Sequence, residues 1–177
     1  AKISEIDNDL LRPVFNLTGT VIHTNFGRSI LPSKTLQDVK EIAENPSNLE
    51  YDVLKTKRGN RDNHISDMLC DITGAEACTI VNNNAAAVIL VLNSLAKRKE
   101  VLVSRGELIE IGGSFRLPEI MKSANCKLKE VGTTNRTHIE DFESEIKKQT
   151  GLILKAHTSN FVIKGFTSNI NHKDLAK

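Results

Sequence analysis

Apolar positions in the first part of the chain recur at the spacing of a helix. Leu36, Val39 and Ile42 lie three residues apart, and this spacing places their side chains on one face of an α-helix. We therefore expect a helix over Pro32–Asn45. A second run with the same period predicts a helix over Ile65–Thr73, which the following glycine ends.

After residue 76, short apolar runs alternate with helical patterns. We expect strands over Ala77–Val81, Val101–Ser104, Lys127–Val131 and Leu152–His157, and helices over Ala85–Ala96, Leu117–Ala124 and Ile139–Lys148. Strands separated by helices form βαβ units, so the pattern predicts an α/β protein with a mostly parallel sheet. Because ligands of such sheets bind beyond the carboxyl ends of the strands, the candidate chemistry is expected in the segments that follow them.

Composition narrows the class of protein only slightly. The chain has 177 residues, of which 39% are hydrophobic and 26% are charged, as in an ordinary globular domain. A net charge of +2 is too small to indicate nucleic-acid binding by itself. The sequence has no apolar run long enough for a membrane span and no signal-peptide pattern at its start. Three cysteines without a CxxC pair indicate reduced thiols in the cytoplasm.

The first candidate site is the asparagine turn Asn82–Asn84, which connects an apolar run to a helix rich in alanine. A helix start offers free backbone N–H groups and the positive end of the helix dipole, and asparagine side chains add uncharged donors. The turn is therefore a candidate anion cup, although it lacks the phosphate-binding pattern GxxxxGK[ST]. From spacing alone, an ordinary asparagine-capped helix is an equally good interpretation.

The second candidate site is the pair Arg58 and Arg61, which lie on either side of Gly59 in the sequence KRGNRD. Glycine lets the backbone bend, so that both guanidinium groups can face one anion. A solvated loop is the alternative, and the residue types alone favour it.

Two further candidates follow predicted strands. Residues Ser104–Arg116 contain two carboxylates, two arginines and three glycines, and a loop of this kind at the end of a strand often lines a site. From composition, a plain surface connection is nearly as good an interpretation. Residues His157–Asn160 follow the last apolar run. His157 is either an acid, a base or a histidine satisfied in the core, and the core role is the commoner one.

The candidate segments together resemble one family. In chain order they read NLTGTVIHTNFGR, KRGNRD, TGAEACTIVNNNAAAV, SRGELIEIGGSFRLPEIM, VGTTNRTHIEDFE and HTSNFVIKGF. Their order and wording resemble bacterial selenocysteine synthase, also called L-seryl-tRNA(Sec) selenium transferase. The resemblance extends from about Arg12 to Ile170.

The resemblance implies a pyridoxal-phosphate (PLP) enzyme of fold type I, the aspartate-aminotransferase-like fold. Residues 1–31 would be an N-terminal arm or linker, and residues 32–177 the first part of the PLP-binding large domain. The implied reaction converts seryl-tRNA(Sec) to selenocysteinyl-tRNA(Sec) with selenophosphate, in a cytoplasmic homo-oligomer that needs no metal and no membrane. PLP would supply the electron sink.

The resemblance also assigns cofactor-binding residues. Asn83 and Asn84 match the cup for the cofactor phosphate. Glu107 lies in the loop expected near the PLP ring. Ser159 and Asn160 match the loop that faces the cofactor or substrate from the next strand.

Substrate-binding residues follow in the same way. Arg58 and Arg61 match the segment in which the family binds an anionic group of the substrate, which we expect to be the phosphate of selenophosphate. His23 and Asn25 lie in the arm that is expected to contribute to the site of a neighbouring subunit.

In the family, the Schiff-base lysine and the aspartate that pairs with the pyridine nitrogen come later in the fold. Lys155 and Lys164 do not match the Schiff-base position, and we interpret them as structural or surface lysines. We therefore expect this stretch of chain to be inactive by itself. A related PLP-dependent lyase acting on a small amino acid or a sugar-acid phosphate, and a non-catalytic truncated module, are the alternatives.

Overall fold

The computed structural model describes residues 11–113 and 115–176. The chain divides into two units between Glu76 and Ala77, and each unit is described by itself. The first ten residues of the predicted arm, and Ser114 in the predicted loop Ser104–Arg116, lie outside the described residues. The predicted boundary between arm and large domain at residue 31 stays a prediction.

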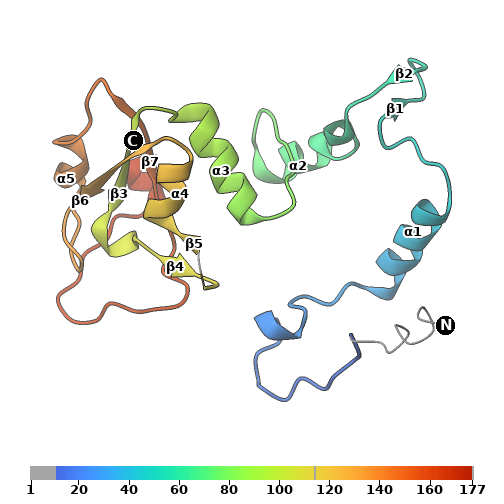
Figure 1. Ribbon diagram of the computed structural model, residues 1–177, viewed down its shortest axis with the longest axis horizontal. Helices are drawn as coiled ribbons and strands as arrows, with labels where there is room; N and C mark the ends of the chain where they lie inside the picture. Colours follow the sequence, from blue (N-terminus) through green and yellow to red (C-terminus); the bar gives the residue numbers. More distant parts are fainter. Residues whose placement is uncertain (1–10, 114, 177) are drawn as a thin grey trace, which may run out of the picture. The chain divides into compact units, whose positions relative to one another are not determined.

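The first unit consists of short elements in sequence (Figure 1). They are η1 (Thr24–Phe26), α1 (Ser33–Glu44), β1 (Tyr51–Asp52), β2 (Lys57–Arg58), η2 (Arg61–His64) and α2 (Ser66–Thr73). Helices α1 and α2 confirm the two helices predicted from apolar spacing. As expected, α2 ends at Gly74, which takes the left-handed conformation with φ 72° and donates its N–H to the carbonyl of Cys70.

An antiparallel hairpin of β1 and β2 was not predicted. Tyr51 pairs with Arg58 and Asp52 with Lys57, and two-residue strands are too short to show an alternation of apolar and polar positions. The N–H of Gly59 donates to the carbonyl of Glu50 at 2.8 Å and continues the pairing by one position.

The second unit is built on a parallel sheet of three strands with the order β6-β3-β7. The central strand is β3 (Glu100–Ser104), flanked by β6 (Lys127–Val131) and β7 (Thr150–Leu154). Val103 lies opposite Glu130 on one side and Leu154 on the other, in parallel register with both. The predicted α/β class with a parallel sheet is therefore confirmed.

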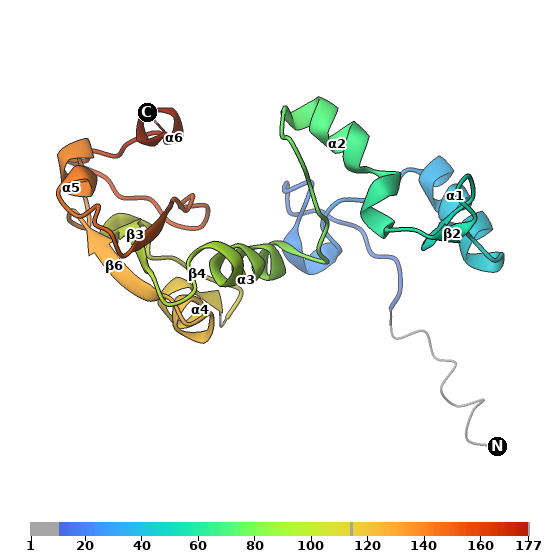
Figure 2. The ribbon, with the colours of Figure 1, turned by 90° about the horizontal axis from the view of Figure 1, so that it is seen from above.

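Helices cover both faces of this sheet (Figures 1 and 2). On one face, Val101 and Val103 pack with α3 (Asn84–Leu95) and α4 (Leu117–Ser123). On the other face, Leu102 packs with Phe142 of α5 (Ile139–Glu143), and Leu175 of α6 (His172–Leu175) adds to this cluster. Successive residues of β3 point to opposite faces, so a continuous apolar strand serves two cores.

Several predicted boundaries were wrong. Residues Ala77–Val81 form no strand, and no ladder of the described chain includes them. The helix predicted to reach Lys148 ends at Glu143. Lys147 and Thr150 exchange two hydrogen bonds of 2.9 Å, which turn the chain into β7 before the predicted start of that strand. The short elements η3 (Arg105–Glu107), β4 (Glu110–Ile111) and β5 (Phe115–Arg116) were not predicted.

Candidate functional site

A cavity of about 700 Å³ lies at the carboxyl ends of the three parallel strands. It is the position at which open α/β sheets bind their ligands. Its walls come from the loops that follow β3, β6 and β7 and from the start of α6. The lining residues are Ser104, Gly106, Glu107, Thr134, Asn135, Arg136, Thr137, Lys155, Ala156, His157, Thr158, Phe161, Val162, Ile163, Thr167, Ser168, Asn169, Ile170, Asn171 and His172.

Close packing between loops holds the floor of this cavity. The buried hydroxyl groups of Ser104 and Thr137 are hydrogen-bonded at 2.8 Å, which joins the end of β3 to the loop after β6. Gly106 packs so closely on the carbonyl of Thr134 that a Cβ atom at Gly106 would clash with that oxygen. Glycine is therefore required here for a close approach of two backbones.

Glu107 is buried in the wall of the cavity, and both of its carboxylate oxygens have partners. Oε1 accepts from Lys155 Nζ at 2.5 Å, and Oε2 accepts from the N–H of Ala156 at 3.0 Å. The carboxylate thus joins the end of β3 to the end of β7. Lys155 lies just after β7, not inside it. Its ion pair agrees with the interpretation of this lysine as structural.

Asn83 is the N-cap of α3. Its side-chain Oδ1 accepts from the N–H of Ala86 at 2.8 Å. Asn84 begins the helix, and three alanines follow. Neither asparagine lines the cavity.

The start of α3 fits a phosphate group. The first N–H groups of a helix point out of its end without intrahelical partners, and the helix dipole favours negative charge there. The side chains of Ala85, Ala86 and Ala87 extend no further than Cβ, so an anion can approach this backbone closely. An asparagine cap and an anion cup are compatible here, since the cap uses one side-chain oxygen and leaves the amide donor of Asn83.

The loop after β7 brings Ser159 and Asn160 beside the cavity without placing them in its wall. The N–H of Ser159 donates to the carbonyl of His157, and Asn160 Nδ2 donates to the carbonyl of Glu110, both at 2.9 Å. These bonds fix the loop, while its members His157 and Thr158 line the cavity. Contact of Ser159 or Asn160 with a cofactor stays a prediction.

His23 and Asn25 form a local turn in the first unit. The N–H of Asn25 donates to His23 Nδ1 at 3.2 Å, and the His23 ring stacks on Phe26 with centroids 4.7 Å apart. A role in the site of a neighbouring subunit stays a prediction.

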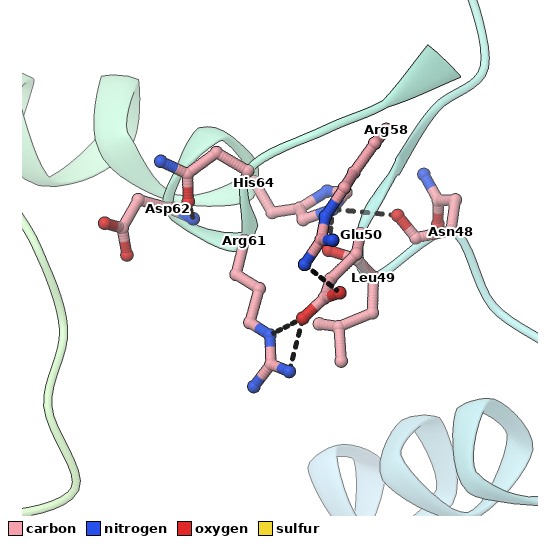
Figure 3. Close-up of polar contacts among 8 residues, drawn as sticks. Asn48, Leu49, Glu50, Arg58, Arg61, Asp62 and His64 are labelled. Atoms are coloured by element: carbon pink, nitrogen blue, oxygen red, sulfur yellow. Dashed lines mark hydrogen bonds and ion pairs between the residues drawn. The ribbon is translucent and has the colours of Figure 1, made fainter. Parts of the chain in front are cut away.

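Arg58 and Arg61 lie together and meet on a carboxylate that the sequence analysis missed. Figure 3 shows both guanidinium groups directed at Glu50. Arg61 Nε donates to Glu50 Oε1 at 2.6 Å and its Nη2 contacts the same oxygen, while Arg58 Nη2 donates to Oε2 at 3.3 Å. No sequence signal marks this pairing, because Glu50 precedes the unpredicted hairpin that brings it to the arginines.

The arginine pair is exposed and its charge is partly neutralised. The side chains of Arg58 and Arg61 are 84% and 66% exposed, and that of Glu50 is 39% exposed. The hydrogen bond from Arg61, with the charges of Arg61 and then Arg58, lowers the pKa of Glu50 against a smaller opposing effect of desolvation. The group of three side chains keeps a net charge of +1, so it remains attractive to anions.

Neither a metal site nor a membrane span was found in the part of the chain that the structure describes. No group of three or more His, Cys, Asp or Glu side chains there has the arrangement to hold a metal ion. None of the helices there has the length and apolar character needed to cross a bilayer.

The fold has a clear counterpart among solved structures. A structure of D-glucosaminate-6-phosphate ammonia-lyase superposes on 82% of this chain and 41% of its own chain, with a TM-score of 0.63 and 19% sequence identity. At this identity the likeness shows the fold alone. It agrees with the parallel sheet described above, and the chain has the PLP-dependent transferase fold of type I that its motifs imply.

The sequence comparisons identify the family. The family model described as L-seryl-tRNA selenium transferase matches residues 14–177. The chain is 54% identical over 166 residues to the L-seryl-tRNA(Sec) selenium transferase of Proteus mirabilis, covering 94% of this chain and 36% of that protein. It is 50% identical over 175 residues to the transferase of the same name from Clostridium botulinum strain 657, covering 99% of this chain and 38% of that protein. The chain belongs to the L-seryl-tRNA selenium transferase family, and it spans little more than a third of the length of these relatives.

Proposed function

We propose that the native protein converts seryl-tRNA(Sec) to selenocysteinyl-tRNA(Sec), with selenophosphate as the selenium donor and PLP as the cofactor. The observation that carries this proposal is the continuous family match over residues 14–177, with about half of the positions identical to transferases of that name. The fold, with its cavity at the carboxyl ends of the strands, supports the same function. The proposal extends to a cytoplasmic homo-oligomer.

Asn83, Asn84 and the start of α3 would hold the cofactor phosphate. This assignment rests on the cap geometry and on the small side chains that follow it. When bound, PLP supplies an electron sink for bond breaking at the amino-acid carbon atoms.

Glu107 would lie near the cofactor and would also orient the site. Its two oxygens hold Lys155 and the N–H of Ala156, so it fixes where the loop after β7 begins. Ser159 and Asn160 lie on that loop, and we propose that they face the cofactor or the substrate. Contact of Glu107 with the cofactor stays a prediction.

Arg58 and Arg61 would bind the phosphate of selenophosphate. Their guanidinium groups converge on the carboxylate of Glu50, and this convergence supports the proposal. His23 and Asn25 are proposed to complete the site of a neighbouring subunit.

The test is a selenium-transfer assay with the full native protein. Purified protein is incubated with PLP, selenophosphate and seryl-tRNA(Sec), and the amino acid released from the tRNA is identified by mass spectrometry. We expect selenocysteine, and only serine when selenophosphate is omitted. A protein that binds PLP stoichiometrically and transfers no selenium would contradict the proposal. Release of ammonia from a sugar-acid phosphate in that case would favour the lyase alternative.

Cofactor binding has a separate test. Asn83→Ala is expected to weaken PLP binding roughly tenfold, because a donor to the phosphate and the helix cap are both lost. The dissociation constant is measured by equilibrium dialysis, with Asn93→Ala on the same helix as the control. If native protein and Asn83→Ala bind PLP with equal affinity, Asn83 does not hold the cofactor phosphate.

A further inference from the structure

We propose that Glu50 is an exchangeable counter-ion of the arginine pair, which the incoming phosphate-type anion displaces. The inference rests on the proposed role of Arg58 and Arg61 in binding the phosphate of the selenium donor. It adds a residue that sets the affinity of that site. In this account Glu50 keeps both guanidinium groups directed at one point until a stronger anion takes its place.

The local structure holds the carboxylate and the two arginines together. Gly59 donates its N–H to the carbonyl of Glu50, so the hairpin fixes the backbone of the carboxylate beside β2. His64 Nε2 lies 3.2 Å from the carbonyl oxygens of both Asn48 and Leu49, which ties η2, the turn that carries Arg61, to the residues just before Glu50 (Figure 3). The convergence therefore rests on hydrogen bonds to the backbone carbonyls of Glu50 and of the two residues before it.

The chemistry of the cluster favours exchange. A carboxylate offers two oxygens and one negative charge, whereas a phosphate-type anion offers three oxygens and up to two charges to the same donors. Arg61 directs Nε and Nη2 at one oxygen of Glu50, and Arg58 reaches the other oxygen at only 3.3 Å. Neither arginine makes the parallel two-bond pairing that is strongest for guanidinium groups. Because the side chains are exposed, breaking these ion pairs costs little.

Glu50 also sets the charge that the anion meets. With the carboxylate in place the cluster carries +1, and after its displacement the two guanidinium groups face the anion with +2. A weakly charged anion gains too little to displace Glu50. The carboxylate therefore selects for anions of higher charge, such as phosphate, over monovalent ones.

The test compares phosphate binding by native protein, Glu50→Gln and Glu41→Gln. Each substitution removes one negative charge from the first unit, but the Glu41 side chain makes no ion pair within the described residues, so Glu41→Gln is the matched control. The full native protein is saturated with PLP, which fills the cofactor phosphate site, and is then titrated with inorganic phosphate by calorimetry. Thermal melting of each variant checks that folding is retained.

We expect Glu50→Gln to bind phosphate about three- to tenfold more tightly than native protein, because exposed ion pairs no longer have to be broken. Glu41→Gln should bind as native protein does. Glu50→Asp, whose carboxylate is one methylene shorter and meets the arginines less well, should give a smaller gain and serves if Glu50→Gln does not fold. Unchanged or weaker phosphate binding by Glu50→Gln would overturn the inference.

Arg58→Ala and Arg61→Ala separate this inference from the proposed function. Loss of phosphate binding in both arginine variants, without a gain in Glu50→Gln, would overturn the counter-ion role alone. Native-like phosphate binding in both arginine variants would overturn the anion site itself, and the role of Glu50 with it.

Discussion

Glu107 and Glu50 both form ion pairs, and these ion pairs differ in burial. Glu107 is 11% exposed in its side chain, and both of its oxygens are used, by Lys155 and by a backbone N–H. Glu50 meets two arginines whose side chains are 84% and 66% exposed. A buried pair is costly to open because each partner would be left unsatisfied, whereas an exposed pair exchanges with water and ions at little cost. Burial therefore makes one carboxylate structural and leaves the other exchangeable.

The units that carry these carboxylates differ in the same way. The second unit has a core on each face of its sheet, with Leu92, Leu102 and Met121 fully buried. Within the described part of the first unit no residue is buried. The packed core of the second unit holds the walls of the cavity in place. In the first unit, the exposed side chains of the hairpin can exchange their partners at little cost.

Removing the buried carboxylate should have the largest effect. Glu107→Ala leaves Lys155 and the N–H of Ala156 without their partner, and we expect the free energy of unfolding to fall by about 2 to 3 kcal/mol. Urea unfolding followed by circular dichroism measures the change. Glu107→Gln keeps an oxygen for the N–H of Ala156 and should lose less. If Glu107→Ala unfolds at the same urea concentration as native protein, the carboxylate does not hold the strand ends together.

The next largest difference between the two units is expected in the reactivity of their cysteine thiols. Burial raises the pKa of Cys126, so the fraction of reactive thiolate at pH 8 falls, and access is also blocked. Cys70 in the first unit is only half-buried. We expect iodoacetamide to modify Cys70 at least about tenfold faster than Cys126, as followed by peptide mass spectrometry. Equal rates would show that the core around Cys126 opens readily.

The helix cap should have a smaller effect. Asn83→Ala removes the acceptor for the N–H of Ala86, and we expect a loss of about 1 kcal/mol in unfolding free energy. Asn83→Ser retains a cap and should restore most of it. Since PLP binding is assayed separately, a loss of stability without a loss of affinity would assign Asn83 to the helix alone.

The exposed carboxylate should have the smallest effect on stability. We expect Glu50→Gln to lower the free energy of unfolding by at most about 1 kcal/mol, because exposed ion pairs contribute little. The difference in unfolding free energy between native protein and Glu50→Gln should stay small when the salt concentration is raised. A loss of stability in Glu50→Gln as large as that in Glu107→Ala would make this pair structural and would remove the difference between the two carboxylates.

The sequence predicted elements that depend on local pattern. Helices α1 and α3 and strand β6 were predicted from the local pattern of residues. Prediction from the sequence failed where the formation of an element depends on contacts with distant residues. Residues Ala77–Val81 have a strand-like composition, but a strand also needs a partner, which composition does not reveal.

The two carboxylates show the same limit in the candidate site. Glu107 was expected in the loop near the cofactor, and it does line the cavity, but its pairing with Lys155 joins residues 48 positions apart. Glu50 was missed because its contact with the arginines depends on the hairpin β1–β2, whose strands have two residues each. The residue types indicated which side chains could take part in a site. Contacts between residues far apart in the sequence decided which partner each side chain has.

The most direct test of the central claim is the dependence of selenium transfer on selenophosphate concentration in the full native protein and two variants. If the arginine pair binds the selenium donor and Glu50 competes with it, Arg61→Ala should raise the KM for selenophosphate about tenfold or more, and Glu50→Gln should lower it. An unchanged KM in Arg61→Ala, with transfer still proceeding, would contradict the account.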